Sequence, residues 1–147
     1  LKMSQDTVAI GADHAGFKLK FALITALRSL GFRVLDLGTN GLDSVDYPDF
    51  ADAVAKAVSD GLAQSGVLIC GSGIGMSIGA NRHPGVRAAL CHDEETARLA
   101  REHNDANVLV LGARLTDEEL AGRCADVFFS TEFDGGERHA RRVAKLA

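Results

Sequence analysis

Short apolar runs alternate along the chain with longer segments in which apolar residues recur every three or four positions. The run TVAIG at 7–11 predicts a strand, and FKLKFALITALRSL at 17–30 predicts a helix. Gly31 then stands where a helix C-cap glycine belongs. The same alternation predicts strands at 32–38, 66–70, 87–90 and 108–111, helices at 47–59, 75–81, 93–102 and 116–129, and a last helix after the glycines at 135 and 136.

This order of elements indicates an α/β protein. Five apolar strands separated by helices form a parallel sheet, and right-handed crossovers place helices on both of its faces. We therefore predict a three-layer α/β/α, Rossmann-like domain with a five-stranded parallel sheet. The 147 residues suit one domain, and no repeat, low-complexity tract or linker divides them, so we expect a single domain over 1–147.

The first six residues, LKMSQD, lack the apolar segment of a signal peptide. We take Met3 as the native start and expect residues 1–6 to be disordered or to include residues foreign to the natural protein. No apolar run approaches the roughly 20 residues of a membrane-spanning helix. The sequence thus predicts a cytoplasmic protein with no membrane partner.

Charge and cysteine content narrow the function further. A net charge of −4 argues against a nucleic-acid partner, which usually requires a basic face. The three cysteines, Cys70, Cys91 and Cys124, form no CxxC pair, so we expect neither a disulfide nor a structural zinc site.

Ligands of open α/β sheets bind beyond the carboxyl ends of the strands. The residues that follow each predicted strand are therefore the candidates for a site. They are Asp13, His14 and Gly16, then 39–47, then 70–75, then Cys91 and His92, and finally 112–114.

The segment LICGSGIGMSIGAN at 68–81 is the most informative of these. A glycine loop that leads from a strand into a helix presents unpaired backbone N–H groups to an anion or a developing oxyanion. The dinucleotide pattern GxGxxG and the P-loop pattern both fail at Met76, and the loop has no lysine. A cysteine phosphatase would need an arginine at that same position. The loop is therefore a neutral amide cradle with a thiol beside it.

Two interpretations of Cys70 remain open. At a helix N-terminus its thiolate would be stabilised and could act as a base or nucleophile. Alternatively, Cys70 is a buried core cysteine, since free cysteine is among the most buried residue types. We expect Cys91 and Cys124 to be structural.

Other polar residues also have two possible roles. Asp13 is a candidate site residue or a helix cap, and His103 is a catalyst or a favourable charge at a helix C-terminus. Arg138 and Arg142 lie four residues apart on one helix face, which suits a phosphate or a solvated basic helix.

Taken together, five segments give a specific resemblance. They are GADHAGFKLK, DYPDFA, LICGSGIGMSIGANR, RAALCHDEETARLAREHNDANVLVLGAR and FDGGERHARRV, in this order over essentially the whole chain. The sequence resembles the ribose-5-phosphate isomerase B family, which includes allose-6-phosphate and galactose-6-phosphate isomerases. The resemblance implies metal-free, cofactor-free interconversion of a phosphorylated aldose and ketose. It also implies a homodimer with active sites shared between subunits, and leaves open whether two such dimers pair into a tetramer.

The resemblance assigns roles to individual residues. Cys70 matches the general base of one subgroup, and Met76 occupies the position where another subgroup has a glutamate base. The catalytic set is Cys70, Ser72, His103, which matches the histidine that opens the sugar ring, and Asp13. The substrate-binding set is Tyr47 and Asn104 for hydroxyls, His14, Arg114, Arg138 and Arg142 for phosphate, and the loop residues Gly71, Gly73, Ile74 and Gly75.

The expected reaction is the interconversion of ribose 5-phosphate and ribulose 5-phosphate through an enediolate. A six-carbon substrate, allose 6-phosphate or galactose 6-phosphate, is the nearest alternative. A sugar-phosphate-binding module without catalysis is a third.

Overall fold

The computed structural model describes residues 6–147 and contains one five-stranded parallel sheet. The strand order is β2-β1-β3-β5-β4, and all neighbouring strands are parallel. The strands are β1 (Thr7–Ala12), β2 (Arg33–Asp36), β3 (Ser65–Cys70), β4 (Ala88–Leu90) and β5 (Val108–Gly112). The chain moves outward from β1 to β2 and then returns to β3, so the order reverses between β1 and β3. Such a switch point leaves a crevice at the carboxyl ends of the two strands.

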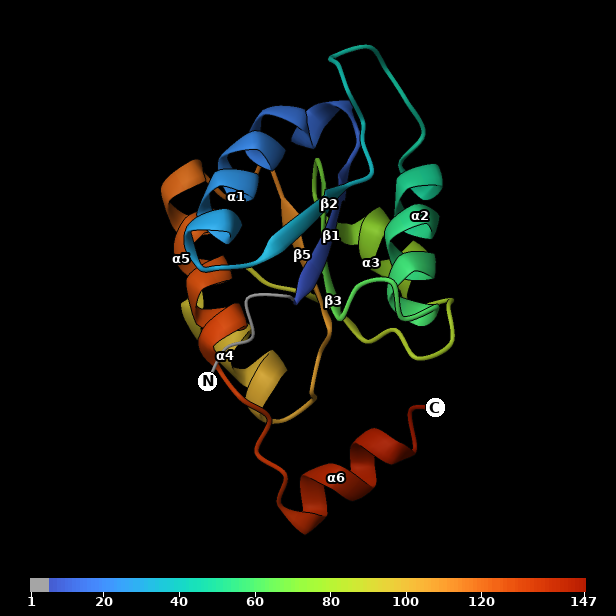
Figure 1. Cartoon of the computed structure of the whole chain (residues 1–147), viewed down its shortest axis with the longest axis vertical. Coiled ribbons are helices and arrows are strands. Elements are labelled where there is room, and N and C mark those ends of the chain that lie inside the picture. The colour runs from blue at the N-terminus through green and yellow to red at the C-terminus, as the bar shows by residue number, and fades with distance from the viewer. Residues whose placement is uncertain (1–5) are drawn as a thin grey trace.

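Helices cover both faces of the sheet, as predicted (Figure 1). One face is packed by α1 (Phe17–Ser29), α4 (Glu94–Glu102) and α5 (Glu118–Ser130), and the other by α2 (Tyr47–Ser59) and α3 (Ile74–Ala80). Side chains alternate between the faces along each strand. Val67 and Ile69 of β3 accordingly join the first core, while Leu68 and Cys70 join the second.

The predicted element boundaries shift by one or two residues for identifiable reasons. The helix expected from 93 begins at Glu94 because Asp93 is its N-cap, with its side chain accepting the Thr96 N–H. The helix expected from 116 begins at Glu118, since the carboxylate of Asp117 caps it. Gly31 has a φ of 96°, which is the left-handed conformation of a residue that ends a helix. A single 3-10 turn, His14–Gly16, precedes α1 and was not predicted.

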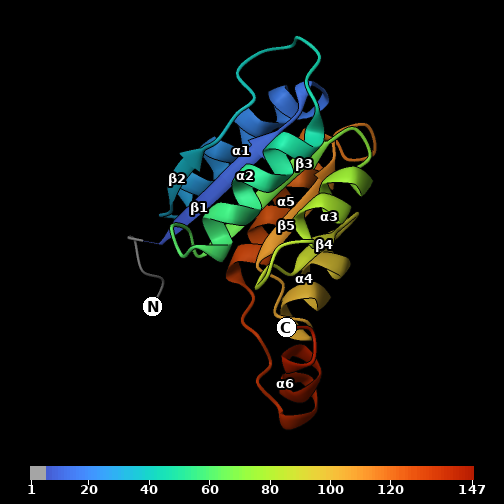
Figure 2. The same cartoon turned by 90° about the vertical axis from the view of Figure 1, so that its right-hand side faces the viewer.

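The last helix, α6 (Glu137–Ala144), lies apart from the three layers (Figure 2). The structure describes every residue of α6, and none is buried. Two contacts join this region to the end of α4. The Asp134 N–H donates to the Glu102 carbonyl at 3.0 Å, and the His139 ring stacks on the His103 ring.

The expectation for residues 1–6 falls mostly outside the described part of the chain. Only Asp6 belongs to it, and its carbonyl accepts the Arg33 N–H at 3.0 Å beside β2. Among residues 6–147, no helix combines the length and apolar character needed to cross a membrane.

Candidate active site

The glycine loop after β3 folds back onto the Cys70 thiol. Cys70 ends the strand, and the Gly73 N–H donates to its sulfur at 3.2 Å. Gly73 caps α3 with a φ of 81°, a conformation that side chains of L-residues rarely adopt. The Ile74 N–H donates to the Ser72 hydroxyl at 3.2 Å. The loop therefore directs the Gly73 N–H to the thiol and the Ile74 N–H to the Ser72 hydroxyl.

Two longer side chains border this loop. Arg114 comes from the turn after β5, and its N–H donates to the Gly71 carbonyl at 2.9 Å. Its guanidinium covers Gly71, where a Cβ would lie 3.1 Å from Nη1. Tyr47, the first residue of α2, lies so close to Gly75 that a Cβ there would be 2.5 Å from the phenol ring. A cation and a phenol thus border the loop that follows the thiol.

Asp13 and His14 follow β1 at the same edge of the sheet. One carboxylate oxygen of Asp13, Oδ1, accepts the N–H groups of Ala15 and Gly16, so Asp13 does cap the short turn. Its other oxygen has no hydrogen-bond partner within residues 6–147, so a cap and a ligand role are compatible. The Val45 N–H donates to Nδ1 of His14 at 3.2 Å. A neutral His14 therefore carries its proton on Nε2.

The remaining site candidates lie at the opposite edge of the sheet. His103 and Asn104 form the turn between α4 and β5, and Arg138 and Arg142 are exposed on α6. Cys70 pairs in register with Gly112 at the far end of β5, so the strand's rise places the two edges ~13 Å apart. The structure brings together the residues around Cys70, but within one chain it does not bring His103, Asn104, Arg138 or Arg142 to them.

The second group is itself compact. The ring centroids of His103 and His139 are 4.5 Å apart, with an angle of 9° between the ring planes. His139 lies between Arg138 and Arg142 in the sequence. This stack places the arginine-bearing helix beside the candidate ring-opening histidine.

Cys70 is buried in the second core, at 5% exposed, so burial does not separate its two interpretations, and the other two cysteines are core residues, as expected. Cys91 and Cys124 are buried in the first core. Burial, with Cys124 close by, raises the pKa of the Cys91 thiol to about 12. Burial likewise raises the pKa of Cys124 to about 11. Met76 is also fully buried and belongs to the second core.

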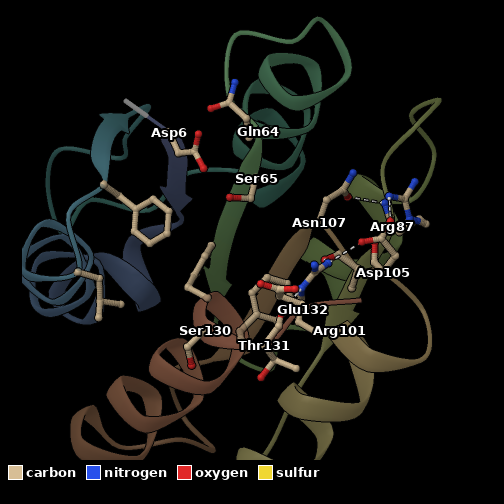
Figure 3. A pocket seen from close by; sticks show the side chains of 15 residues that line it. Asp6, Gln64, Ser65, Arg87, Arg101, Asp105, Asn107, Ser130, Thr131 and Glu132 are labelled. Atoms are coloured by element: carbon tan, nitrogen blue, oxygen red, sulfur yellow. Dashed lines mark hydrogen bonds and ion pairs between the residues drawn. The ribbon is translucent and has the colours of Figure 1, made fainter. Parts of the chain in front are cut away.

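A cavity of about 720 Å³ lies at the amino ends of the strands, away from Cys70 (Figure 3). Its polar wall contains Arg87, Arg101 and Asp105, and the Asp105 carboxylate pairs with both arginines. None of the residues predicted for the site lines it. Within residues 6–147, no group of three or more His, Cys, Asp or Glu side chains is arranged to hold a metal ion.

The sequence did not single out Arg101 or Lys20, and Val45 entered only as part of the range 39–47. Each of the three forms a hydrogen bond that holds a candidate segment or a segment leading to one. For Lys20 a signal was present. It lies on the same side of the helix at 17–30 as the apolar residues Leu23, Ile24 and Leu27, and all four side chains are buried.

Known proteins share both the sequence and the fold. The ribose/galactose isomerase family matches residues 8–146. The chain is 43% identical over 139 residues to the ribose-5-phosphate isomerase B of Escherichia coli K12, covering 95% of this chain and 93% of that protein.

Solved structures agree. The ribose-5-phosphate isomerase B of Clostridium thermocellum superposes with a TM-score of 0.93 at 48% identity, covering 95% of this chain and 94% of that one. The ribose-5-phosphate isomerase B of Thermotoga maritima superposes with a TM-score of 0.92 at 50% identity, covering 96% of this chain and 97% of that one. The resemblance and the three-layer fold are therefore confirmed, and the chain belongs to the ribose/galactose isomerase family.

Proposed function

We propose that the protein is an aldose–ketose isomerase that interconverts ribose 5-phosphate and ribulose 5-phosphate. The observation that carries this proposal is the Cys70 thiol, which accepts the Gly73 N–H at the start of a glycine loop that lacks any lysine. Relatives named ribose-5-phosphate isomerase B, at 40–50% identity, support the choice of the pentose. The reaction belongs to the pentose phosphate pathway, and we expect it to take place in the cytoplasm.

The thiolate of Cys70 would take the proton from C2 of the open-chain aldose. The electron pair forms the C1–C2 double bond of an enediolate, and the oxygen at C1 takes up the negative charge. N–H groups of 71–75 and the Ser72 hydroxyl stabilise that oxygen, as in oxyanion holes where one donor is worth roughly 3–4 kcal/mol. The proton of the C2 hydroxyl then passes to the oxygen at C1, which moves the negative charge to the oxygen at C2, and return of the abstracted proton to C1 leaves the C2 ketone. C1 is reduced as C2 is oxidised, so the reaction needs no external oxidant.

A second copy of the chain would complete the site. Cys70, Ser72, Asp13, His14, Tyr47 and Arg114 lie at one edge of the sheet, while His103, Asn104, Arg138 and Arg142 lie at the other. Three apolar side chains beside the Cys70 loop are exposed, namely Tyr47 at 41%, Ile74 at 55% and Ile78 at 60%. Ile74 and Ile78 share one face of α3, which suits a helix that packs against a partner. We infer a homodimer in which each site takes residues from both subunits.

The test is turnover of ribose 5-phosphate in deuterated water, followed by NMR, for the wild type, Cys70→Ala and the matched control Cys91→Ala. Wild type and Cys91→Ala should isomerise the sugar and exchange the transferred proton. Cys70→Ala should fold and bind but lose at least about a thousandfold in kcat, because a base acts in the transition state.

Allose 6-phosphate and galactose 6-phosphate serve as competing substrates in the same assay. A higher kcat/KM for either would replace the pentose in our proposal. Binding of ribose 5-phosphate without turnover by the folded wild type would identify a binding module instead.

A further inference from the structure

Asp105 has a backbone conformation that needs an explanation. Its φ is +48°, and no other non-glycine residue among 6–147 has a positive φ. The left-handed region costs an L-residue roughly 1–2 kcal/mol, although aspartate tolerates it better than most. Asp105 directly follows His103 and Asn104. The left-handed turn therefore sets the direction of the two residues assigned to the substrate.

Two arginines hold this turn in place (Figure 3). Nη1 of Arg101 donates to Oδ1 of Asp105 at 2.8 Å and to the Ala106 carbonyl at 2.7 Å. Nε of Arg87 donates to the Asp105 carbonyl at 2.8 Å, and its Nη2 lies 3.4 Å from Oδ2. The carboxylate and the backbone of Asp105 are thus both bound.

Arg101 also reaches the segment that leads to α6. Its Nε donates to the Thr131 carbonyl at 3.0 Å, just after α5 ends. One guanidinium therefore joins the His103 turn to the start of the 131–136 linker, and α6 with Arg138 and Arg142 follows directly. The planar guanidinium of arginine donates several charge-assisted hydrogen bonds in fixed directions, so it can hold two backbone segments at a set distance. The flexible lysine ammonium cannot do so.

Most of this cluster lies outside the two apolar cores, and its contact with the first core is that of the Arg101 guanidinium, 5.9 Å from the ring centroid of Phe128. Arg101, Arg87 and Asp105 line the cavity at the amino edge and are partly exposed. Partly exposed ion pairs of this kind contribute little net stability, because water screens both charges. These ion pairs are therefore better explained by a role in fixing the position of the turn and the 131–136 linker than by a contribution to the free energy of unfolding.

We propose that Arg101 is a positioning residue that sets the orientation of His103 and Asn104 and, through Thr131, that of the α6 arginines. This rests on the proposed function, in which those four residues contact the substrate. Arg101 itself touches no reacting atom.

The matched pair for the test is Arg101→Met and Arg98→Met. Arg98 lies one turn earlier on α4 and, within residues 6–147, forms ion pairs only with Glu95 and Glu102 on the helix surface. Arg101→Met should lower kcat/KM for ribose 5-phosphate by about ten- to a hundredfold, as expected for groups displaced by around 1 Å. Arg101→Lys should recover only a minor part of that loss, and Arg98→Met should stay within twofold of the wild type.

Residue-resolved hydrogen exchange gives a readout that does not depend on activity. In Arg101→Met the amides of Asp105 and Asp134 should exchange at least about tenfold faster, whereas amides of β3 should be unchanged. Wild-type kinetics in Arg101→Met, or unchanged exchange at both amides, would overturn the proposal. If instead the amides change while His103→Asn and Arg142→Ala keep full activity, the proposed site is wrong and the positioning contact stands.

Variants of Asp105 provide a second test if Arg101→Met does not fold. Asp105→Asn keeps a side chain that tolerates the left-handed conformation and can accept a hydrogen bond from Arg101, so its kcat/KM should fall least. Asp105→Gly keeps the backbone conformation but removes the carboxylate, and Asp105→Ala loses both. The expected order of kcat/KM is Asn, then Gly, then Ala, and equal activity of all three would overturn the proposal.

Discussion

The ammonium of Lys20 is fully buried and lies 2.7 Å from Oδ1 of Asp36. The Asp36 side chain is 34% exposed, so the two partners of this ion pair differ in their access to water. Oδ1 of Asp36 also accepts the Gly38 N–H at 3.0 Å, at the start of the loop between β2 and α2. The pair therefore joins α1 to the loop that leads, through Val45, to His14.

The two partners should respond unequally to mutation. Asp36→Ala leaves a buried ammonium without its partner and should cost about 3–5 kcal/mol in the free energy of unfolding. Lys20→Met leaves a carboxylate that water can reach, so its cost should be clearly smaller. Urea denaturation of both variants measures the difference, and equal losses would show that Lys20 is hydrated in solution.

Cys70 should be the cysteine that alkylating reagents modify. A pKa of about 12 leaves only about one Cys91 thiol in ten thousand ionised at pH 8, and of the two buried thiols Cys91 is 1% exposed and Cys70 5%. Iodoacetamide at pH 8 should therefore add one group per native chain, at Cys70, with loss of activity. Peptide mass spectrometry locates the adduct, and unfolded protein should take up three. Modification of Cys91 ahead of Cys70 would contradict the assignment.

The Cys91 thiol should also make stability depend on alkaline pH. Its pKa is raised from 9.0 to about 12 in the folded state, so between these values the unfolded chain releases the proton more readily. The free energy of unfolding should then fall by up to about 1.4 kcal/mol per pH unit in this window from Cys91 alone, and no such loss should occur below pH 9. Urea denaturation of wild type and Cys91→Ala from pH 8 to 11 isolates this contribution by difference. Parallel curves would contradict it.

Gly73→Ala and Gly61→Ala form a matched pair. Their φ angles are 81° and 79°, so both variants should lose a similar roughly 1 kcal/mol from backbone strain. A Cβ at Gly61 meets open space, whereas one at Gly73 would lie 2.5 Å from Cδ1 of Leu90. Gly73→Ala should also move the N–H that binds the thiol and lower kcat at least about tenfold. Isomerase kinetics beside denaturation curves test this, and equal activity of the two variants would refute the role of Gly73.

The sequence predicted local structure well because each strand and helix has its own signal. The switch from short apolar runs to spaced apolar residues, and the glycine at 31, located the elements to within two residues. Contacts between segments distant in the chain have no such signal. Nothing in the local sequence pairs Lys20 with Asp36, or Arg101 with Thr131.

The candidate site was likewise predictable where it depends on local structure, and not where it depends on contacts between distant segments. Residues that follow strands gather at one edge because parallel strands share a direction, and Asp13, Tyr47, Cys70 and Arg114 could be grouped on that basis. The left-handed turn at Asp105 could not be anticipated, since it depends on two arginines that approach from different elements.

The separation of Cys70 from His103 has a consequence for mixtures of mutant subunits. Cys70→Ala and His103→Asn should each be inactive as pure homodimers, because both of their composite sites carry the lesion. In a two-fold symmetric dimer formed from one subunit of each kind, one site carries both lesions and the other carries none. Unfolding and refolding an equimolar mixture gives such hybrids in half of the dimers, so about a quarter of the wild-type activity should return from two dead proteins. Intersubunit complementation of this kind cannot occur if each chain builds its site alone.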